Sequence, residues 1–145
     1  MKLVSILVAE DDPADRFLIE ESLGKSFLAN TLHFVKDGVE AMAFLRNEGM
    51  YADKVKYPKP GLFLLDLNMP KKDGREVLEE VREDPTLCTI PIVVLTTSKE
   101  DEDLCRSYKL GANSYITKPV DFEGFVKLMS VLDMYWFGIV KLPDQ

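Results

Sequence analysis

Short, mainly apolar runs recur along the chain, and three of them end abruptly in polar side chains. These three cover Leu3 to Ala9, Leu62 to Leu65 and Pro91 to Leu95. They do not alternate regularly between apolar and polar positions, which is typical of strands buried on both faces of a parallel sheet. Two further segments rich in β-branched and aromatic residues, Thr31 to Val35 and Ser114 to Thr117, also predict strands.

Segments with apolar residues at helical spacing separate these predicted strands. The first predicted helix begins with Asp12 and Pro13, a pair typical of a helix N-terminus. Another predicted helix ends at Gly111, a typical C-terminal residue. The predicted helices cover Pro13 to Leu23, Val39 to about Asn47, Arg75 to Glu83, Glu100 to Gly111, and Asp121 to about Trp136. In the first two helices these residues are expected to face the core: Ala14, Leu18, Ile19, Leu23, Val39, Met42, Ala43 and either Leu45 or Phe44.

Five strands that alternate with five helices predict an α/β fold, a doubly wound five-stranded parallel sheet with helices on both faces. We expect one domain over residues 1–133, then a C-terminal extension of the last helix with an apolar tail over residues 134–145. Between Asn47 and Pro60 the periodicity is lost, which predicts a long loop with a short helical turn. Long loops often contact partners, so we expect this loop to border the functional site and help select a partner, and a passive insertion is the alternative.

The charge and the apolar runs restrict the functions open to this protein. The sequence has 25 acidic and 18 basic residues and no basic cluster longer than Lys71-Lys72, which argues against a nucleic-acid surface. No apolar run approaches the length of a membrane span, and Cys88 and Cys105 lack the spacing of metal ligands. We therefore expect a reduced, soluble, cytoplasmic protein. His33 lies in the middle of a predicted strand and is expected to be structural.

Polar side chains follow four of the five predicted strands at the points where they end. Each is common by itself, but the carboxyl ends of parallel strands meet at one edge of the sheet, so one crevice can hold them all. They are Glu10, Asp11, Asp66, Thr96 and Lys118.

Three carboxylates at one point would repel each other unless a cation neutralises them. The ligands are all oxygens, with neither histidine nor cysteine near them in the sequence, which favours Mg²⁺ over Zn²⁺. With Mg²⁺ and Lys118 in the crevice, an incoming phosphoryl group meets positive charge. Asp66 is then placed to attack phosphorus, and Thr96 to donate its hydroxyl to a phosphoryl oxygen.

From about Leu3 to Leu132 the chain resembles the receiver domains of two-component response regulators. The resemblance rests on the five strand-end residues and their order, and it implies a flavodoxin-like (βα)5 fold. It also implies that Asp66 accepts a phosphoryl group from a histidine kinase and later loses it by self-dephosphorylation, so that the protein is not an enzyme that turns over a substrate.

The resemblance implies further roles at matching positions. The backbone carbonyl of Asn68 becomes a metal ligand beside Glu10, Asp11 and Asp66, and Tyr115 becomes the switch aromatic that responds with Thr96. The bond between Lys118 and Pro119 is implied to be cis. This chain departs from the family in two places. Glu10 stands where Asp is commoner, and Thr97 stands where Ala or Ser is usual. The bulk of Thr97 is expected to narrow the entry to the site.

A narrower resemblance is to the stand-alone response regulators of bacterial phytochrome histidine kinases. It rests on the long loop, on Thr-Thr-Ser-Lys after the fourth strand, and on Trp-Phe-Gly-Ile-Val-Lys-Leu-Pro near the end. A phytochrome-type kinase is therefore the expected partner, and a non-phytochrome kinase with this protein as phosphorelay intermediate is the alternative. The apolar tail also predicts a homodimer through the fourth helix, the fifth strand and the last helix.

Two other functions on the same architecture fit the sequence less well. A flavodoxin-like cofactor binder needs hydroxyl and glycine donors after the first strand, where Glu10, Asp11 and Asp12 would repel a flavin phosphate. A phosphohydrolase of the haloacid dehalogenase type needs a second aspartate two residues after the nucleophile. Position 68 is Asn, so that acid is absent.

Overall fold

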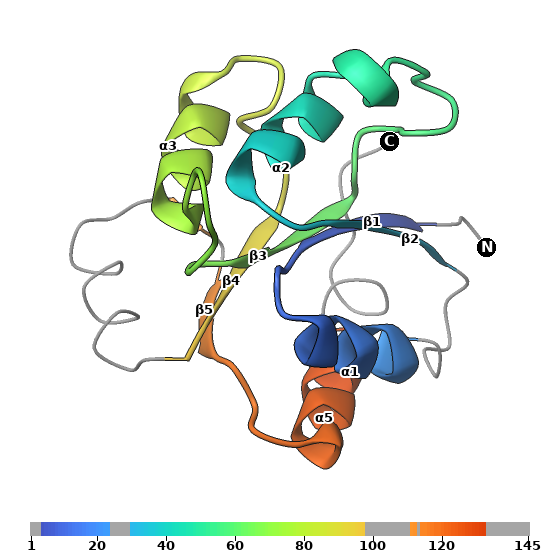
Figure 1. Ribbon diagram of the computed structural model, residues 1–145, viewed down its shortest axis with the longest axis vertical. Helices are drawn as coiled ribbons and strands as arrows, with labels where there is room; N and C mark the ends of the chain where they lie inside the picture. Colours follow the sequence, from blue (N-terminus) through green and yellow to red (C-terminus); the bar gives the residue numbers. More distant parts are fainter. Residues whose placement is uncertain (1–3, 24–29, 98–110, 113, 133–145) are drawn as a thin grey trace.

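The computed structural model describes residues 4–23, 30–97, 111–112 and 114–132. A five-stranded sheet in the order β2-β1-β3-β4-β5 forms the middle layer, and all four strand pairs are parallel (Figure 1). The strands are β1 (Val4–Ala9), β2 (Asn30–Val35), β3 (Leu62–Asp66), β4 (Ile92–Thr96) and β5 (Ser114–Thr117). The described helices are α1 (Pro13–Leu23), α2 (Gly38–Leu45), the 3-10 helix η1 (Gly49–Tyr51), α3 (Gly74–Glu83) and α5 (Phe122–Leu132).

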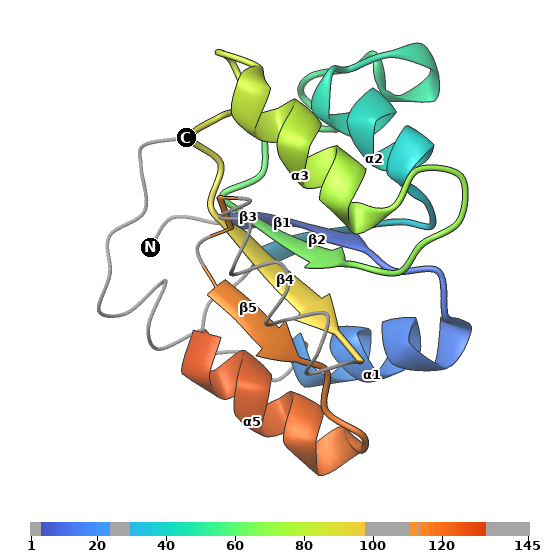
Figure 2. The same cartoon turned by 90° about the vertical axis from the view of Figure 1, so that its left-hand side faces the viewer.

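Helices cover both faces of the sheet, which confirms the predicted doubly wound α/β fold. Helices α2 and α3 lie on one face, and α1 and α5 lie side by side on the other (Figure 2). The chain passes from β1 outward to β2 and then returns across β1 to β3. The strand order therefore reverses between β1 and β3, and crevices for ligands form beside such reversals.

The core has two layers because alternate residues of each strand point to opposite faces. Phe63 and Leu65 of β3 pack with the cluster under α2 and α3, whereas Leu62 and Leu64 pack with the cluster under α1 and α5. All five residues of β3 and all five of β4 are buried, as their unbroken apolar pattern predicted. Burial of each large apolar side chain contributes about 1.5–3 kcal/mol, so this core is the main source of stability.

The predicted buried faces of the helices are correct in part. Ile19 and Leu23 of α1 are buried, but Ala14 is exposed, because it lies in the first turn beside solvent-exposed Asp12. Val39 is 53% exposed and the prediction that it faces the core is wrong. Met42, Phe44 and Leu45 are buried, as predicted, and Ala43 packs half-buried against the core. Helix α2 begins one residue earlier than expected, after its N-cap Asp37, and it also buries Ala41, which was not predicted.

Several predictions lie outside the described residues. These are the fourth helix, Cys105, the continuation of the last helix to Trp136, and the C-terminal tail. Within α5, Phe125, Met129 and Leu132 are buried. Among the described residues, no helix is both long enough and apolar enough to cross a membrane.

The loop from Asn47 to Pro60 is organised by an aromatic cluster and contains the expected helical turn, η1. The rings of Tyr51 and Tyr57 pack against each other and against Phe44, and His33 contacts Phe44 and Tyr57, in agreement with a structural role for the histidine. The side-chain amide of Asn47 donates hydrogen bonds to the backbone carbonyls of both tyrosines, at 3.0 and 2.9 Å.

This loop does not border the crevice, and that expectation is wrong. It connects the end of α2 to the start of β3, and the N–H of Gly61 donates to the carbonyl of Ser5 near the start of β1. In a parallel sheet, a connection from helix to strand returns to the amino ends of the strands. The loop therefore lies at the edge opposite the strand ends that carry Glu10 and Asp66.

Candidate functional site

The carboxyl edge of the sheet carries the predicted site residues. Glu10 follows β1, Asp66 ends β3, Thr96 ends β4 and Lys118 follows β5. Asp66 is in register with Leu95 of β4, which brings Thr96 to the same edge. All four site residues are buried, Thr96 completely.

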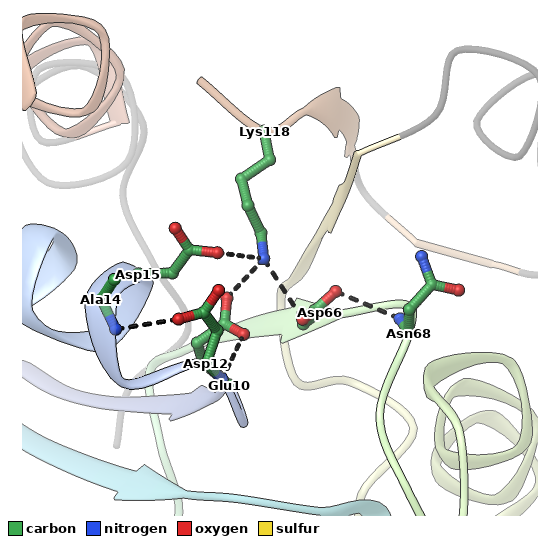
Figure 3. Close-up of polar contacts among 7 residues, drawn as sticks. All are labelled: Glu10, Asp12, Ala14, Asp15, Asp66, Asn68 and Lys118. Atoms are coloured by element: carbon green, nitrogen blue, oxygen red, sulfur yellow. Dashed lines mark hydrogen bonds and ion pairs between the residues drawn. The ribbon is translucent and has the colours of Figure 1, made fainter. Parts of the chain in front are cut away.

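Lys118 lies at the centre of this edge. Its ammonium nitrogen, Nζ, lies 2.6 Å from Oε1 of Glu10, 2.9 Å from Oδ2 of Asp15 and 3.2 Å from Oδ2 of Asp66. Figure 3 shows its side chain reaching from the end of β5 into this group of carboxylates. A lysine ammonium has three N–H donors, so the three carboxylates together can use all of them.

Asp15, in the first turn of α1, is the site residue that the sequence analysis missed. An acid in the first turn of a helix is ordinary, because it interacts favourably with the positive end of the helix dipole. Asp15 and Lys118 are 103 residues apart in sequence, and no spacing pattern connects them. Their contact depends on how the first turn of α1 is placed over the end of β5.

Three of the predicted ligands form a group that fits a divalent cation. Carboxylate oxygens of Glu10, Asp11 and Asp66 all lie within 4.8 Å of one another, and Asp11 is exposed while the other two are buried. An all-oxygen group that opens to solvent on one side suits a hard cation that retains water ligands. The backbone N–H of Asn68 donates to Oδ1 of Asp66 at 3.1 Å, which places the backbone of this fourth predicted ligand beside the group (Figure 3).

The burial of this group changes the charge that its members carry. Burial is the main cause that raises the pKa of Glu10 from its ordinary 4.5 to about 8, the hydrogen bond with Asp66 adds to the rise, and the hydrogen bond with Lys118 opposes it. Burial also lowers the pKa of Lys118, but hydrogen bonds with Glu10 and Asp15 outweigh this effect, so the pKa lies above its ordinary value. Lys118 therefore remains charged, whereas Glu10 keeps a proton near neutral pH that a bound cation would displace.

Two glycines allow the loop after β3 to pack closely against neighbouring backbone. A Cβ atom on Gly74 would lie 2.6 Å from the carbonyl oxygen of Asp66, and one on Gly38 would lie 2.0 Å from the carbonyl oxygen of Lys72. Both neighbours are backbone atoms, so a side chain at either position would displace this loop. Asp73 then begins α3 as its N-cap, and its side chain accepts a hydrogen bond from the N–H of Glu76.

The structure also places the residues implied only by resemblance. Tyr115 is buried, and its hydroxyl accepts a hydrogen bond from the N–H of Ala112 at 3.2 Å. Thr97 is exposed beside Thr96. No cis peptide bond occurs among the described residues, so the predicted cis bond before Pro119 is wrong. Trans is the favoured isomer even before proline, and Lys118 reaches Glu10 and Asp66 with this bond trans.

Comparisons with known proteins agree with this architecture. Residues 6–130 match the response regulator receiver domain. The chain is 44% identical over 138 residues to the response regulator Rcp1 of Synechocystis sp. (strain ATCC 27184 / PCC 6803 / Kazusa), a match that covers 95% of this chain and 92% of Rcp1.

Two solved structures extend this similarity to three dimensions. The phosphorylated cyanobacterial phytochrome response regulator RcpA is 44% identical with a TM-score of 0.90, over 99% of this chain and 100% of RcpA. The Mn²⁺-bound form of Rcp1 is 43% identical with a TM-score of 0.86, over 97% of this chain and 99% of Rcp1.

Proposed function

The chain belongs to the response regulator receiver domain family, and on this premise we propose that Asp66 accepts a phosphoryl group from a histidine kinase. Receiver-domain response regulators are signalling proteins that bind a divalent metal. The observation that carries the proposal is the buried pairing of Lys118 with Asp66, 3.2 Å apart, beside the acidic group that fits such a cation. Mass spectrometry after incubation with Mg²⁺ and acetyl phosphate tests it, because phosphoryl transfer adds a defined mass to the protein.

In the proposed reaction, a carboxylate oxygen of Asp66 forms a bond to phosphorus. The bond from phosphorus to the kinase's histidine nitrogen breaks, and its electron pair returns to the imidazole. Lys118 donates from Nζ to one phosphoryl oxygen and Thr96 donates its hydroxyl to another, so the charge of the group is balanced as it transfers. Attack by water on the same phosphorus later restores the carboxylate, which is self-dephosphorylation. Thr96 and Tyr115 are the residues proposed to respond to the phosphoryl group as a switch.

We propose that the cation is Mg²⁺, held by Asp11, Asp66 and the backbone carbonyl of Asn68, with Glu10 acting through a water. When bound, it neutralises negative charge on the phosphoryl oxygens. The support for this set is the mutual distance of the carboxylates and the absence of nitrogen or sulfur donors among them.

Asp11→Ala is expected to weaken Mg²⁺ binding by at least about tenfold, because it removes the exposed ligand through which the cation enters. Isothermal titration calorimetry measures the affinity. Asp12→Asn is the matched control, since Asp12 is also exposed but its side chain caps α1 by accepting from Ala14 N–H, which Asn can still do. Equal affinities for the Asp11→Ala variant and the parent would exclude this ligand set.

The proposed kinase partner is of the phytochrome type. The support is the similarity to RcpA, which is a cyanobacterial phytochrome response regulator, over nearly the whole of both chains. A phosphorylated phytochrome-type kinase is expected to transfer its phosphoryl group to this protein faster than a kinase of another class. The measurement is the rate at which each kinase loses a labelled phosphoryl group. The opposite order of rates would favour the alternative, a regulator of a non-phytochrome kinase that acts as a phosphorelay intermediate.

We also propose that the protein forms a homodimer through the face of the fourth helix, β5 and α5. Two observations on apolar residues support this proposal. Val131 of α5 is 60% exposed, and the sequence after this helix contains further apolar residues such as Phe137, Ile139 and Val140. Analytical ultracentrifugation at high micromolar concentration is expected to show a dimer for the full chain and a weaker one for a version that ends at Asp133. If the full chain and the shortened version are both monomeric in this experiment, the tail does not serve association.

A further inference from the structure

Asp15 differs from the other two carboxylates that contact Lys118. Glu10 and Asp66 belong to the group of oxygens that fits a cation, and Asp15 does not. Asp15 nevertheless makes the second shortest contact with the ammonium, at 2.9 Å. It comes from α1, and its side chain is 21% exposed, whereas those of Lys118, Glu10 and Asp66 are 5%, 1% and 5% exposed.

The other two contacts change when the site is used. A bound cation would displace the proton of Glu10 and compete with Lys118 for its carboxylate, and phosphorylation would convert the carboxylate of Asp66 into an acyl phosphate. Lys118 then has one N–H to direct at the phosphoryl group and needs acceptors for the others, because an unpaired buried N–H is costly. Among the described residues that contact Nζ, Asp15 is the acceptor that neither event alters.

We propose that Asp15 is a positioning residue for phosphoryl transfer, which holds the Lys118 ammonium at the carboxyl edge so that it can donate to the phosphoryl group. This inference rests on the proposed function of Asp66. A lysine has four rotatable bonds in its side chain, and the charged hydrogen bond with Asp15 limits the movement of the ammonium away from Asp66. Asp15 thereby affects the rate of transfer without touching the phosphoryl group.

A purely electrostatic role predicts the opposite effect. Asp15 adds negative charge near the path of an anionic donor, so its removal by itself should speed the approach of that donor. Asp12 supplies a matched comparison, since it lies in the same acidic segment and its side chain contacts Ala14 rather than Lys118. A positioning role and a charge role therefore change the rate in different directions.

The test uses the full chain with saturating Mg²⁺ and acetyl phosphate, and measures the initial rate at which the protein gains phosphoryl mass. Asp15→Asn is expected to lower this rate about tenfold, the loss of a typical charged hydrogen bond. Asp15→Glu keeps the charge within reach of Lys118 and is expected to recover most of the rate. Asp12→Asn is expected to match the parent or exceed it slightly.

The outcomes separate this inference from the proposed function. If the parent gains mass and Asp15→Asn is as fast as Asp12→Asn, the positioning role is wrong while the role of Asp66 stands. A slow Asp15→Glu variant also overturns it, because rescue by charge is what positioning requires. If the parent gains no mass, both proposals fail together. Circular dichroism verifies folding, and Asp15→Ser, which also removes the charge, replaces Asp15→Asn in the comparison if the latter does not fold.

Discussion

Asp66→Asn is expected to abolish phosphoryl labelling by acetyl phosphate and by a phosphorylated kinase. The amide has nearly the shape of the carboxylate, but it carries no charge and is a poor nucleophile toward phosphorus. The ammonium of Lys118, 3.2 Å from Oδ2 of Asp66, would also lose a charged partner. Intact-protein mass spectrometry, with Mg²⁺ present throughout, measures the result.

Asp73→Asn is the matched control for this prediction. Asp73 lies in the loop that follows Asp66, and its side chain caps α3 by accepting from the N–H of Glu76 at 3.0 Å, a role that Asn also fills. This variant should be labelled like the parent. Labelling of Asp66→Asn at the parent's rate would show that another residue accepts the phosphoryl group.

Lys118→Met is expected to lower the free energy of unfolding of the metal-free protein by about 3–5 kcal/mol at pH 8, because it leaves buried carboxylates without their cation. The side chains of Glu10 and Asp66 are 1% and 5% exposed, so water cannot replace the ammonium. Denaturant unfolding measures the change, and added Mg²⁺ is expected to recover part of it.

The size of this loss should depend on pH. Lys118 lowers the pKa of Glu10, so without it the folded-state pKa rises above about 8, further from the ordinary 4.5. Between these values the folded protein holds a proton that the unfolded chain has released, so this group's contribution to the free energy of unfolding falls as the pH rises. Between pH 4.5 and about 8 both folded proteins hold this proton, so the difference between parent and variant should change little in that range and grow as the pH rises above 8.

Lys72→Met is the control for this prediction, because it removes a lysine from a more exposed ion pair. Lys72 pairs with Glu80, and their side chains are 26% and 31% exposed. Its removal is expected to cost no more than about 1 kcal/mol. A similar cost for Lys118→Met would show that the carboxylates at the strand ends do not depend on the buried ammonium.

Local sequence patterns predicted the strands and most helices of this protein, and the reason is burial. A strand covered on both faces cannot alternate between apolar and polar residues, so β3 and β4 were recognisable as central parallel strands. Polar residues at the ends of such strands meet at one edge of the sheet, which is why Glu10, Asp66 and Lys118 could be expected together.

The errors in the helices have a different cause. A small or β-branched residue near a helix end fits the apolar stripe in sequence, but its burial depends on where the helix starts and on what covers that turn. Val39 is exposed because α2 begins at Gly38. Ala14 is exposed because the first turn of α1 lies at the carboxyl edge of the sheet. Similarly, the long loop after α2 was assigned to the wrong edge, although βαβ topology requires it to return to the amino ends of the strands.

By itself, the sequence determined the fold class, the order of elements and the set of strand-end residues, because these follow from periodicity and from chain direction in a parallel sheet. Only the tertiary structure decided how the groups pair within the site. The contact between Asp15 and Lys118 joins the first turn of α1 to the end of β5, and its 2.9 Å distance depends on how α1 and α5 pack on one face. Packing of two helices against a sheet sets such distances, and neither spacing nor composition records them.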